Sequence, residues 1–220
     1  NISHELKTPV FNIQGYILTL LDGGLEDPTI NRTYLAKAEK SINRLIAIIE
    51  DLETINLLES NELKLNLNRF NLVDVAREAV ESLEMKAKKR DCEVFINYNL
   101  ERPIYVLADR QRILQVVTNL IDNAIKYGKK TGGHIKISFF DMDENILVEI
   151  TDDGPGIAQN DIPHLFERFY RVDKGRSRDM GGTGLGLAIV KHIIEAHHQT
   201  VNVRSTLGVG TTFGFTLKKA

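Results

Sequence analysis

Apolar residues recur at alternating spacings of four and three along the beginning of the chain. In the first stretch they are Leu6, Val10, Ile13, Ile17 and Leu20. This spacing is typical of a helix that presents one apolar seam to a partner helix. The pattern therefore predicts a helix from residue 1 to about residue 22.

A second helix follows after a short break. The Asp-Gly-Gly run at 22–24 predicts the end of the first helix, and Asp27 followed by Pro28 predicts the start of the next. The seam then resumes within residues 29–58, at Leu35, Ala38, Ile42, Leu45, Ile49 and Leu52. A hairpin this long cannot bury its seam alone, whereas two hairpins packed as a four-helix bundle can. We therefore expect an antiparallel helical hairpin that forms a homodimer.

The hydrophobic pattern changes at the polar segment 59–68, which separates a domain of residues 1–60 from a domain of residues 61–220. Leu63, Leu65 and Leu67 alternate with polar residues in this segment, which predicts a strand. The patterns beyond it predict helices near 71–90, 109–128 and 184–197, strands near 92–99, 104–107, 134–141 and 145–152, and a closing hairpin near 200–217. Because the strands fall in neighbouring pairs rather than alternating regularly with helices, the fold class is α+β.

Composition narrows the class of protein. At 42% hydrophobic and 26% charged residues, the 220-residue chain builds a core. Its net charge of −2 gives no general attraction to nucleic acid or an anionic membrane, and Cys92, the only cysteine, excludes an intrachain disulfide. No apolar run reaches the roughly 18 residues of a spanning helix. Because the sequence starts inside a helical pattern, we expect a fragment of a longer protein, without membrane contact of its own.

His4 is the first candidate for chemistry. On a helical wheel with Leu6 at zero, the seam lies within roughly 40°, while His4 falls near about 160° and Thr8 near about 200°. His4 and Thr8 therefore share the outward face, one turn apart. Glu5 is adjacent and could hold the proton of one ring nitrogen, which leaves the other nitrogen as a nucleophile. Taken alone, His4 is better explained as a solvated surface residue beside a helix start.

A polar stripe follows one flank of the predicted helix 109–128. It consists of Asn119, Asn123 and Lys126, at positions i, i+4 and i+7. Amide oxygens suit a hard divalent cation, and a lysine suits phosphate. Mg²⁺ keeps most of its waters, so one asparagine together with nucleotide phosphates is enough to hold it. The alternative is an ordinary polar helix edge.

A carboxylate followed by glycines stands at the end of the predicted strand 145–152. The residues are Asp152, Gly154, Gly156 and Ile157. Asp152 can accept a hydrogen bond from an exocyclic amine, and the glycines let a planar base approach the backbone. The alternative is a simple turn, because Asp-Gly-Pro-Gly is rich in turn formers.

A second glycine-rich run opens the predicted helix 184–197. Glycines before a helix N-terminus present backbone N–H groups to phosphates. The run contains Gly182, Thr183, Gly184, Leu185, Gly186 and Leu187. It is neither a P-loop nor a dinucleotide-binding fingerprint.

About 25 residues without clear periodicity separate the two glycine motifs. They carry Phe166, Arg168 and Arg171, and then Lys174, Arg176 and Arg178. A loop of this length is unusual unless it has a function. We interpret it as a lid that aromatic residues anchor and whose basic residues meet a triphosphate. The alternative is a solvated charged loop.

These motifs together resemble the kinase core of bacterial sensor histidine kinases. Residues 4–9 resemble the H-box of that family, 119–127 its N-box, 152–156 its G1 box, 166–171 its F-box and 182–187 its G2 box. Each motif is modest alone, but five in this order and spacing are specific, and they span essentially the whole chain. The resemblance implies a dimerising phosphotransfer hairpin followed by an α/β-sandwich ATP-binding domain of the GHKL (Bergerat) type.

The resemblance also implies roles for single residues. His4 would be the phosphoacceptor, Glu5 its acid/base partner, and Thr8 a group that positions water when a phosphorylated partner is dephosphorylated. Asn123 would bind Mg²⁺, and Asp152 would bind the adenine amine. The other nucleotide-binding residues would be Asn119, Lys126, Tyr127, Gly154, Gly156, Ile157, Phe166, Arg168, Arg171, Gly182, Thr183, Gly184, Leu185, Gly186 and Leu187.

The resemblance implies an ATP- and Mg²⁺-dependent kinase of a two-component system. It would phosphorylate itself on His4 and pass the phosphoryl group to an aspartate of a response regulator, with possible phosphatase activity toward that regulator. A GHKL ATPase without phosphotransfer and an ATP-binding pseudokinase scaffold are the alternatives. The piece would be the cytoplasmic portion of a protein anchored in the bacterial inner membrane. The sequence leaves open the signal, the regulator, the balance of kinase and phosphatase, and whether phosphorylation occurs in cis or in trans.

Overall fold

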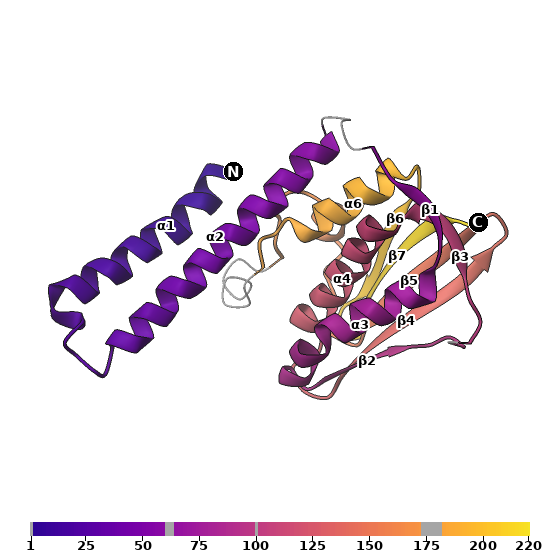
Figure 1. The fold of residues 1–220 in the computed structure, drawn as a ribbon. Helices are drawn as coiled ribbons and strands as arrows, with labels where there is room; N and C mark the ends of the chain where they lie inside the picture. The colour runs from indigo at the N-terminus through magenta and orange to yellow at the C-terminus, as the bar shows by residue number, and fades with distance from the viewer. Residues whose placement is uncertain (1, 60–63, 100, 173–181) are drawn as a thin grey trace.

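The computed structural model describes residues 2–59, 64–99, 101–172 and 182–220. It begins with two long helices, α1 (Ile2–Thr19) and α2 (Asn31–Glu59), which lie side by side and run in opposite directions (Figure 1). A π-helical turn, η1 (Leu20–Gly24), ends α1, and Gly23 there has a φ of +91°. Asp27 accepts a hydrogen bond from the backbone N of Thr29 at 2.8 Å before α2 begins. The predicted hairpin is confirmed.

A second, mixed α/β domain follows the hairpin. Its helices are α3 (Leu72–Lys89), α4 (Arg110–Tyr127) and α6 (Gly186–Ala196), with a short 3₁₀ turn, η2 (Ile162–His164). Its strands are β1 (Leu67–Asn71), β2 (Cys92–Ile96), β3 (Tyr105–Asp109), β4 (Gly133–Met142), β5 (Asn145–Asp152), β6 (Val201–Thr206) and β7 (Gly210–Lys218). The expected order of a helical hairpin and then an α/β domain is therefore confirmed.

The strands form two sheets. The larger has the order β2-β4-β5-β7-β6, with β2 parallel to β4 and the other neighbours antiparallel. The smaller pairs β1 with β3. Helices α3, α4 and α6 cover one face of the large sheet (Figure 1). This two-layer arrangement places the C-terminal end of α4 beside the end of β5, where the two predicted nucleotide motifs meet.

Helices α3 and α4 begin where the sequence supplies a capping side chain. Asn71 accepts from the backbone N of Val73 at 3.2 Å, and Asp109 accepts from the backbone N of Arg112 at 3.2 Å. Each bond satisfies a backbone donor that the first helical turn leaves without a partner. The apolar face predicted for α4 is buried against the sheet, at Ile113, Val116, Val117, Leu120, Ile121 and Ala124.

The strand predicted from Leu63, Leu65 and Leu67 is wrong in position. Strand β1 begins at Leu67, and Leu65 lies before it; Leu63 lies outside the described residues. The strand forms where pairing with β3 brings Phe70 opposite the fully buried Val106. Alternation of leucines was therefore a weaker signal than the presence of a partner strand.

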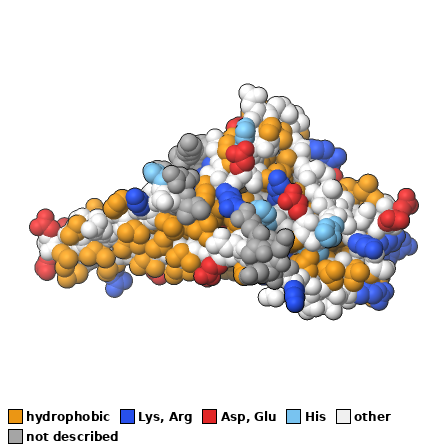
Figure 2. All heavy atoms as spheres, turned by 90° about the horizontal axis from the view of Figure 1, so that it is seen from above, with side chains coloured by type: hydrophobic (Ala, Val, Ile, Leu, Met, Phe, Trp, Pro, Cys, Tyr) orange, Lys and Arg blue, Asp and Glu red, His pale blue; other side chains and the backbone are white. Residues whose placement is uncertain are grey.

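The second half of α2 packs on the α/β domain. Ile48 and Ile55 are fully buried and belong to the same hydrophobic core as α6, and Leu52 packs against this core. The hairpin also presents apolar side chains to solvent along the arm that projects from the α/β domain (Figure 2). Among the described residues, no helix is both long and apolar enough to cross a membrane.

Candidate nucleotide and phosphoacceptor site

A cavity of about 840 Å³ lies between α4, the turn after β5 and the start of α6. Most of the predicted nucleotide residues line it, although they come from four separate segments of the chain. They are Asn119, Asn123, Lys126, Tyr127, Asp152, Gly154, Gly156, Ile157, Arg171, Gly182, Thr183, Gly184, Gly186 and Leu187. The structure thus brings the motifs of the sequence to one hollow.

Three predicted residues do not line the cavity. Phe166 packs edge-on against Phe213 with ring centroids 6.3 Å apart, and Leu185 is fully buried. Arg168 lies outside the cavity wall and near His192. The pKa of His192 is lowered, mainly by burial and to a lesser extent by the charge of Arg168. Phe166 and Leu185 therefore support the wall from behind.

Asp152 marks one end of the cavity. Its Oδ1 accepts from the backbone N of Gly154 at 2.8 Å. Burial raises the pKa of Asp152, the backbone donors of Gly154 and Thr211 oppose this, and nearby Asp153 adds to it. A Cβ at Gly154 would lie 2.7 Å from the Asp152 Oδ1 and 2.8 Å from the Cα of Gly128, so only glycine fits. The Asp152 carboxylate is therefore a hydrogen-bond acceptor beside a glycine backbone that a planar ring can approach closely.

The α4 stripe forms the opposite side. Asn119 donates from Nδ2 to the carbonyl of Gly186 at 3.4 Å, which ties α4 to the start of α6. The Lys126 ammonium lies 2.6 Å from Asp122, whose other oxygen contacts Lys86. Burial alone would raise the pKa of Asp122, but Lys126 and Lys86 hold it below its usual range. Asp122 was missed in the sequence, although its i, i+4 spacing to Lys126 could have indicated it.

The F-box and G2 segments are bonded to each other. Phe169, whose φ is +63°, donates from its backbone N to the carbonyl of Gly184 at 2.8 Å, and Arg171 donates to the carbonyl of Gly182. Gly184 has a φ of +79°, and a Cβ there would lie 3.0 Å from the Cα of Phe169. Lys174, Arg176 and Arg178 of the expected lid lie outside the described residues.

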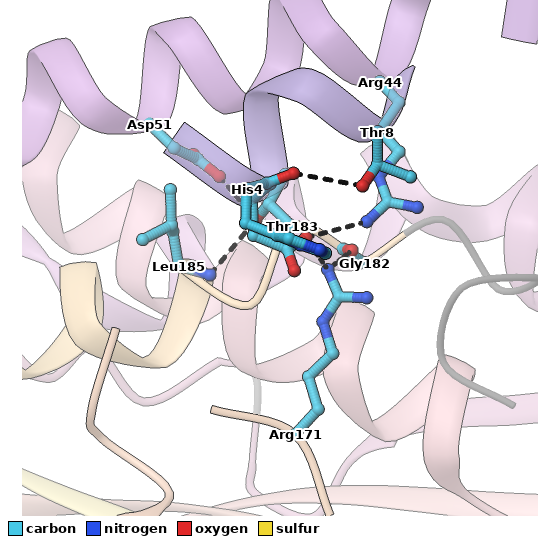
Figure 3. Close-up of polar contacts among 9 residues, drawn as sticks. His4, Thr8, Arg44, Asp51, Arg171, Gly182, Thr183 and Leu185 are labelled. Carbon is cyan, nitrogen blue, oxygen red and sulfur yellow. Dashed lines mark hydrogen bonds and ion pairs between the residues drawn. The ribbon is translucent and has the colours of Figure 1, made fainter. Parts of the chain in front are cut away.

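The H-box lies across from these segments on α1. His4 is exposed, as the helical wheel predicts, and the Thr8 hydroxyl donates to its carbonyl at 3.0 Å. Glu5 pairs with Arg44 of α2 at 3.2 Å and approaches Arg171 of the F-box at 3.7 Å. Figure 3 shows His4 and Thr8 of α1 in the same region as Arg44 of α2 and as Arg171, which donates to the carbonyl of Gly182. The contact of Glu5 with Arg171 therefore brings the H-box end of α1 to the segment that is bonded to Gly182.

The hairpin also contributes residues that the motifs did not indicate. Ala47 and Asp51 of α2 line the cavity, and the Thr183 hydroxyl donates to Asp51 at 2.7 Å. Nothing in the local pattern of α2 distinguishes these positions from others on the same helix. Only the packing of α2 on α6 assigns them to this site.

Fold and site together define a histidine-bearing hairpin joined to a GHKL-type nucleotide domain, and comparison with known families agrees. Residues 108–220 match the family described as "Histidine kinase-, DNA gyrase B-, and HSP90-like ATPase". Residues 1–61 match the family described as "His Kinase A (phospho-acceptor) domain". The chain belongs to the sensor histidine kinases.

Individual relatives cover the chain from end to end. The sensor histidine kinase WalK of Bacillus subtilis is 36% identical over 219 residues, which make up 99% of this chain and 35% of that protein. The phosphate regulon sensor protein PhoR of Haemophilus influenzae is 33% identical over 225 residues, 100% of this chain and 50% of that protein. This chain therefore spans about a third to a half of the length of these relatives.

Solved structures show the same arrangement of domains. The histidine kinase AdeS of Acinetobacter baumannii has a TM-score of 0.76 and 30% identity, and the match covers 98% of both chains. The histidine kinase ThkA, in complex with the response regulator protein TrrA, has a TM-score of 0.77 and 27% identity, covering 100% of this chain and 60% of that one.

Proposed function

We propose that this chain is the kinase core of a two-component system, which transfers the γ-phosphoryl group of ATP to His4. The observation that carries the proposal is an exposed histidine whose neighbour Glu5 lies 3.7 Å from Arg171, a residue that lines a nucleotide-sized cavity. A GHKL ATPase without phosphotransfer would leave this histidine without a role. The match of residues 1–61 to a phospho-acceptor domain supports the same reading.

We assign the two ends of the cavity to the two ends of ATP. Asp152 accepts a hydrogen bond from the adenine amine. It is the carboxylate at the end of β5 that is both largely buried and bonded to the backbone N of Gly154. Lys126 and Arg171 meet the phosphates, with the backbone N–H groups of residues 182–186. The oxygen of Asn123 is a suitable ligand for Mg²⁺, which when bound would neutralise phosphate charge.

The reaction itself needs few protein groups. A ring nitrogen of neutral His4 attacks the γ-phosphorus, the P–O bond to ADP breaks, and ADP leaves with the bonding electrons. The proton on the other ring nitrogen passes to a base, for which Glu5 is the neighbouring carboxylate. Glu5 is engaged by Arg44 and Arg171 in this structure, so it must exchange these partners for the ring, which requires the two domains to move.

We further propose that the core works as a homodimer and serves a response regulator. The exposed apolar side chains of the hairpin support the dimer. The complex of ThkA with TrrA, which matches this chain over its full length, supports an aspartate of a receiver domain as the acceptor. Thr8 lies one turn from His4, where its hydroxyl would orient the water that hydrolyses the aspartyl phosphate of the regulator and releases inorganic phosphate. Residues 1–60 and 61–220 are the two domains of this scheme, on the cytoplasmic side of a membrane-anchored protein.

Labelled ATP tests the reaction. Incubation with ATP labelled at the γ-phosphate and Mg²⁺ should yield labelled protein, whereas ATP labelled at the α-phosphate should not. The label should survive base and be lost in acid, as expected of a phosphorus–nitrogen bond. A GHKL ATPase without phosphotransfer would release phosphate without labelling the protein, and a pseudokinase would do neither, so either result would reject the proposal.

A further inference from the structure

Asp51 of α2 is a carboxylate that the hairpin inserts into the wall of the nucleotide cavity. Its Oδ2 accepts a hydrogen bond from the Thr183 hydroxyl at 2.7 Å, and both residues line the cavity (Figure 3). Thr183 Oγ1 also accepts from the backbone N of Leu185 at 3.2 Å, at the start of α6. One side chain of the hairpin is thus bonded to the loop that is expected to cradle phosphates.

The surroundings of Asp51 show which end of the nucleotide it faces. Burial raises the pKa of Asp51, the Thr183 hydrogen bond and the Lys126 ammonium lower it, and Glu50 raises it. Lys126 and Thr183 are the groups that we assign to phosphate. Asp51 therefore holds negative charge where the phosphates of a nucleotide would also bring negative charge.

The position of α2 is fixed by contacts on both sides of Asp51. Ile48 and Ile55, one turn before and one turn after it, are buried in the core of the α/β domain. On α1, Glu5 approaches Arg171 at 3.7 Å. The backbone of α2 at Asp51 therefore cannot move away from Thr183 without a shift of the hairpin relative to the α/β domain.

We propose that Asp51 is a nucleotide-sensitive latch, whose carboxylate competes with nucleotide phosphates for Thr183 and Lys126. Docking of the hairpin on the cavity and binding of a nucleotide then oppose each other. The inference rests on the proposed function, because it needs the cavity to bind a nucleotide. By linkage, a latch that weakens nucleotide binding is itself loosened when the nucleotide binds, by the same factor. Nucleotide binding would thereby release the hairpin and permit the domain movement that phosphorylation requires.

Binding calorimetry on the whole chain tests the latch. The ligands are ADP with Mg²⁺ and adenosine, and the variants are Asp51→Asn and Glu50→Gln. Asp51→Asn removes the charge and keeps an oxygen for Thr183, so ADP should bind about fivefold tighter or more, the low end of typical coupling between sites. Adenosine has no phosphate, so its affinity should stay unchanged. Glu50→Gln removes the same charge from an exposed neighbour on the same helix and should leave ADP affinity within about twofold.

The calorimetry distinguishes a failure of the latch from a failure of the proposed function. Equal ADP affinity in Asp51→Asn and the parent chain would overturn the latch, as would an equal gain for adenosine. A parent chain that binds neither ligand would instead reject the proposed function. Should Asp51→Asn fail to fold, Asp51→Ala takes its place, because alanine favours the helix. On the unmodified chain, ADP should accelerate amide hydrogen exchange in the second half of α2, and unchanged or slower exchange would contradict the proposal.

Discussion

At the scale of single residues, Asp152 is held in an unfavourable state by the fold. Burial raises the pKa of its carboxyl group, so the ionised form carries a cost in the folded chain at neutral pH. Backbone donors at Gly154 and Thr211 offset only part of it. A buried carboxylate that keeps this cost is a feature of binding sites more than of structural turns.

Asp152→Asn should therefore separate binding from stability. The amide oxygen can still accept from Gly154, but the NH₂ group would face the adenine amine as a second donor. We expect nucleotide affinity to fall at least about tenfold, while the midpoint of thermal unfolding stays within about 3 °C or rises. Calorimetry with ADP and a thermal melt measure the two effects.

Asp153→Asn is the matched control. Asp153 also lines the cavity, but its carboxylate is engaged by His134, whose backbone N donates to it at 3.0 Å. Nucleotide affinity should stay within about twofold. A loss in Asp153→Asn as large as that in Asp152→Asn would assign the effect to the charge of the turn rather than to a contact with the base.

Residues that belong to a contiguous motif could be found from the sequence, because local order holds them together. Asn119, Asn123 and Lys126 share one helical flank, and the structure places all three on the cavity wall. Asp51 could not be found in this way, because it belongs to the site only through the packing of α2 on α6. A single sequence does not contain that packing.

At the scale of elements, the hairpin retains an apolar surface that one chain does not cover. The helix α2 exposes Leu35, Ile42 and Ile49, and α1 exposes Val10 and Ile17. All five belong to the seam seen in the sequence. Contiguous apolar surface of this kind marks an interface with another protein. The two-fold pairing of identical hairpins would bury these side chains in both copies of the chain.

Ile42→Glu tests this interface. The substitution places two carboxylates in the centre of a proposed two-fold seam, so the dissociation constant of the dimer should rise at least about 100-fold. Sedimentation equilibrium should show a dimer for the parent chain and a monomer for the variant. Met85→Glu adds the same charge on α3, at a side chain that is 77% exposed, and should leave the dimer intact. A parent chain that is monomeric at every concentration would contradict the bundle.

The boundaries of an element could be predicted where the signals for them lie within that element. Helices with a cap and an apolar face, such as α3 and α4, lie within a residue or two of their predicted limits. Strand β1 does not begin where the sequence predicts, because its position depends on pairing with β3, more than 30 residues later in the sequence. Signals within one element can be identified in the sequence, whereas the pairing of distant strands is known only from the structure.

At the scale of the whole molecule, the contact of Glu5 with Arg171 joins the hairpin to the nucleotide domain of the same chain. The sequence left open whether His4 receives its phosphoryl group from its own chain or from the partner chain. Because Glu5, the neighbour of His4, already contacts Arg171 of its own chain, we predict transfer in cis.

A mixed dimer of His4→Gln and Asn123→Ala chains tests the direction of transfer. Transfer in cis requires both intact residues in one chain, so the mixed dimer should remain unlabelled by γ-labelled ATP. A mixed dimer of His4→Gln with an unmodified chain is the control and should carry about half of the label of the parent dimer. Strong labelling of the doubly defective pair would show transfer in trans.

The central claim is that His4 accepts the phosphoryl group of an ATP bound in the cavity. Labelling of His4→Gln with γ-labelled ATP, beside calorimetry with ADP on the same preparation, tests it most directly. We predict complete loss of the acid-labile label with ADP affinity within about twofold of the parent. His198→Asn changes an exposed histidine on the far side of α6, at a positive φ that asparagine tolerates, and should label normally. Label that persists in His4→Gln would contradict the account.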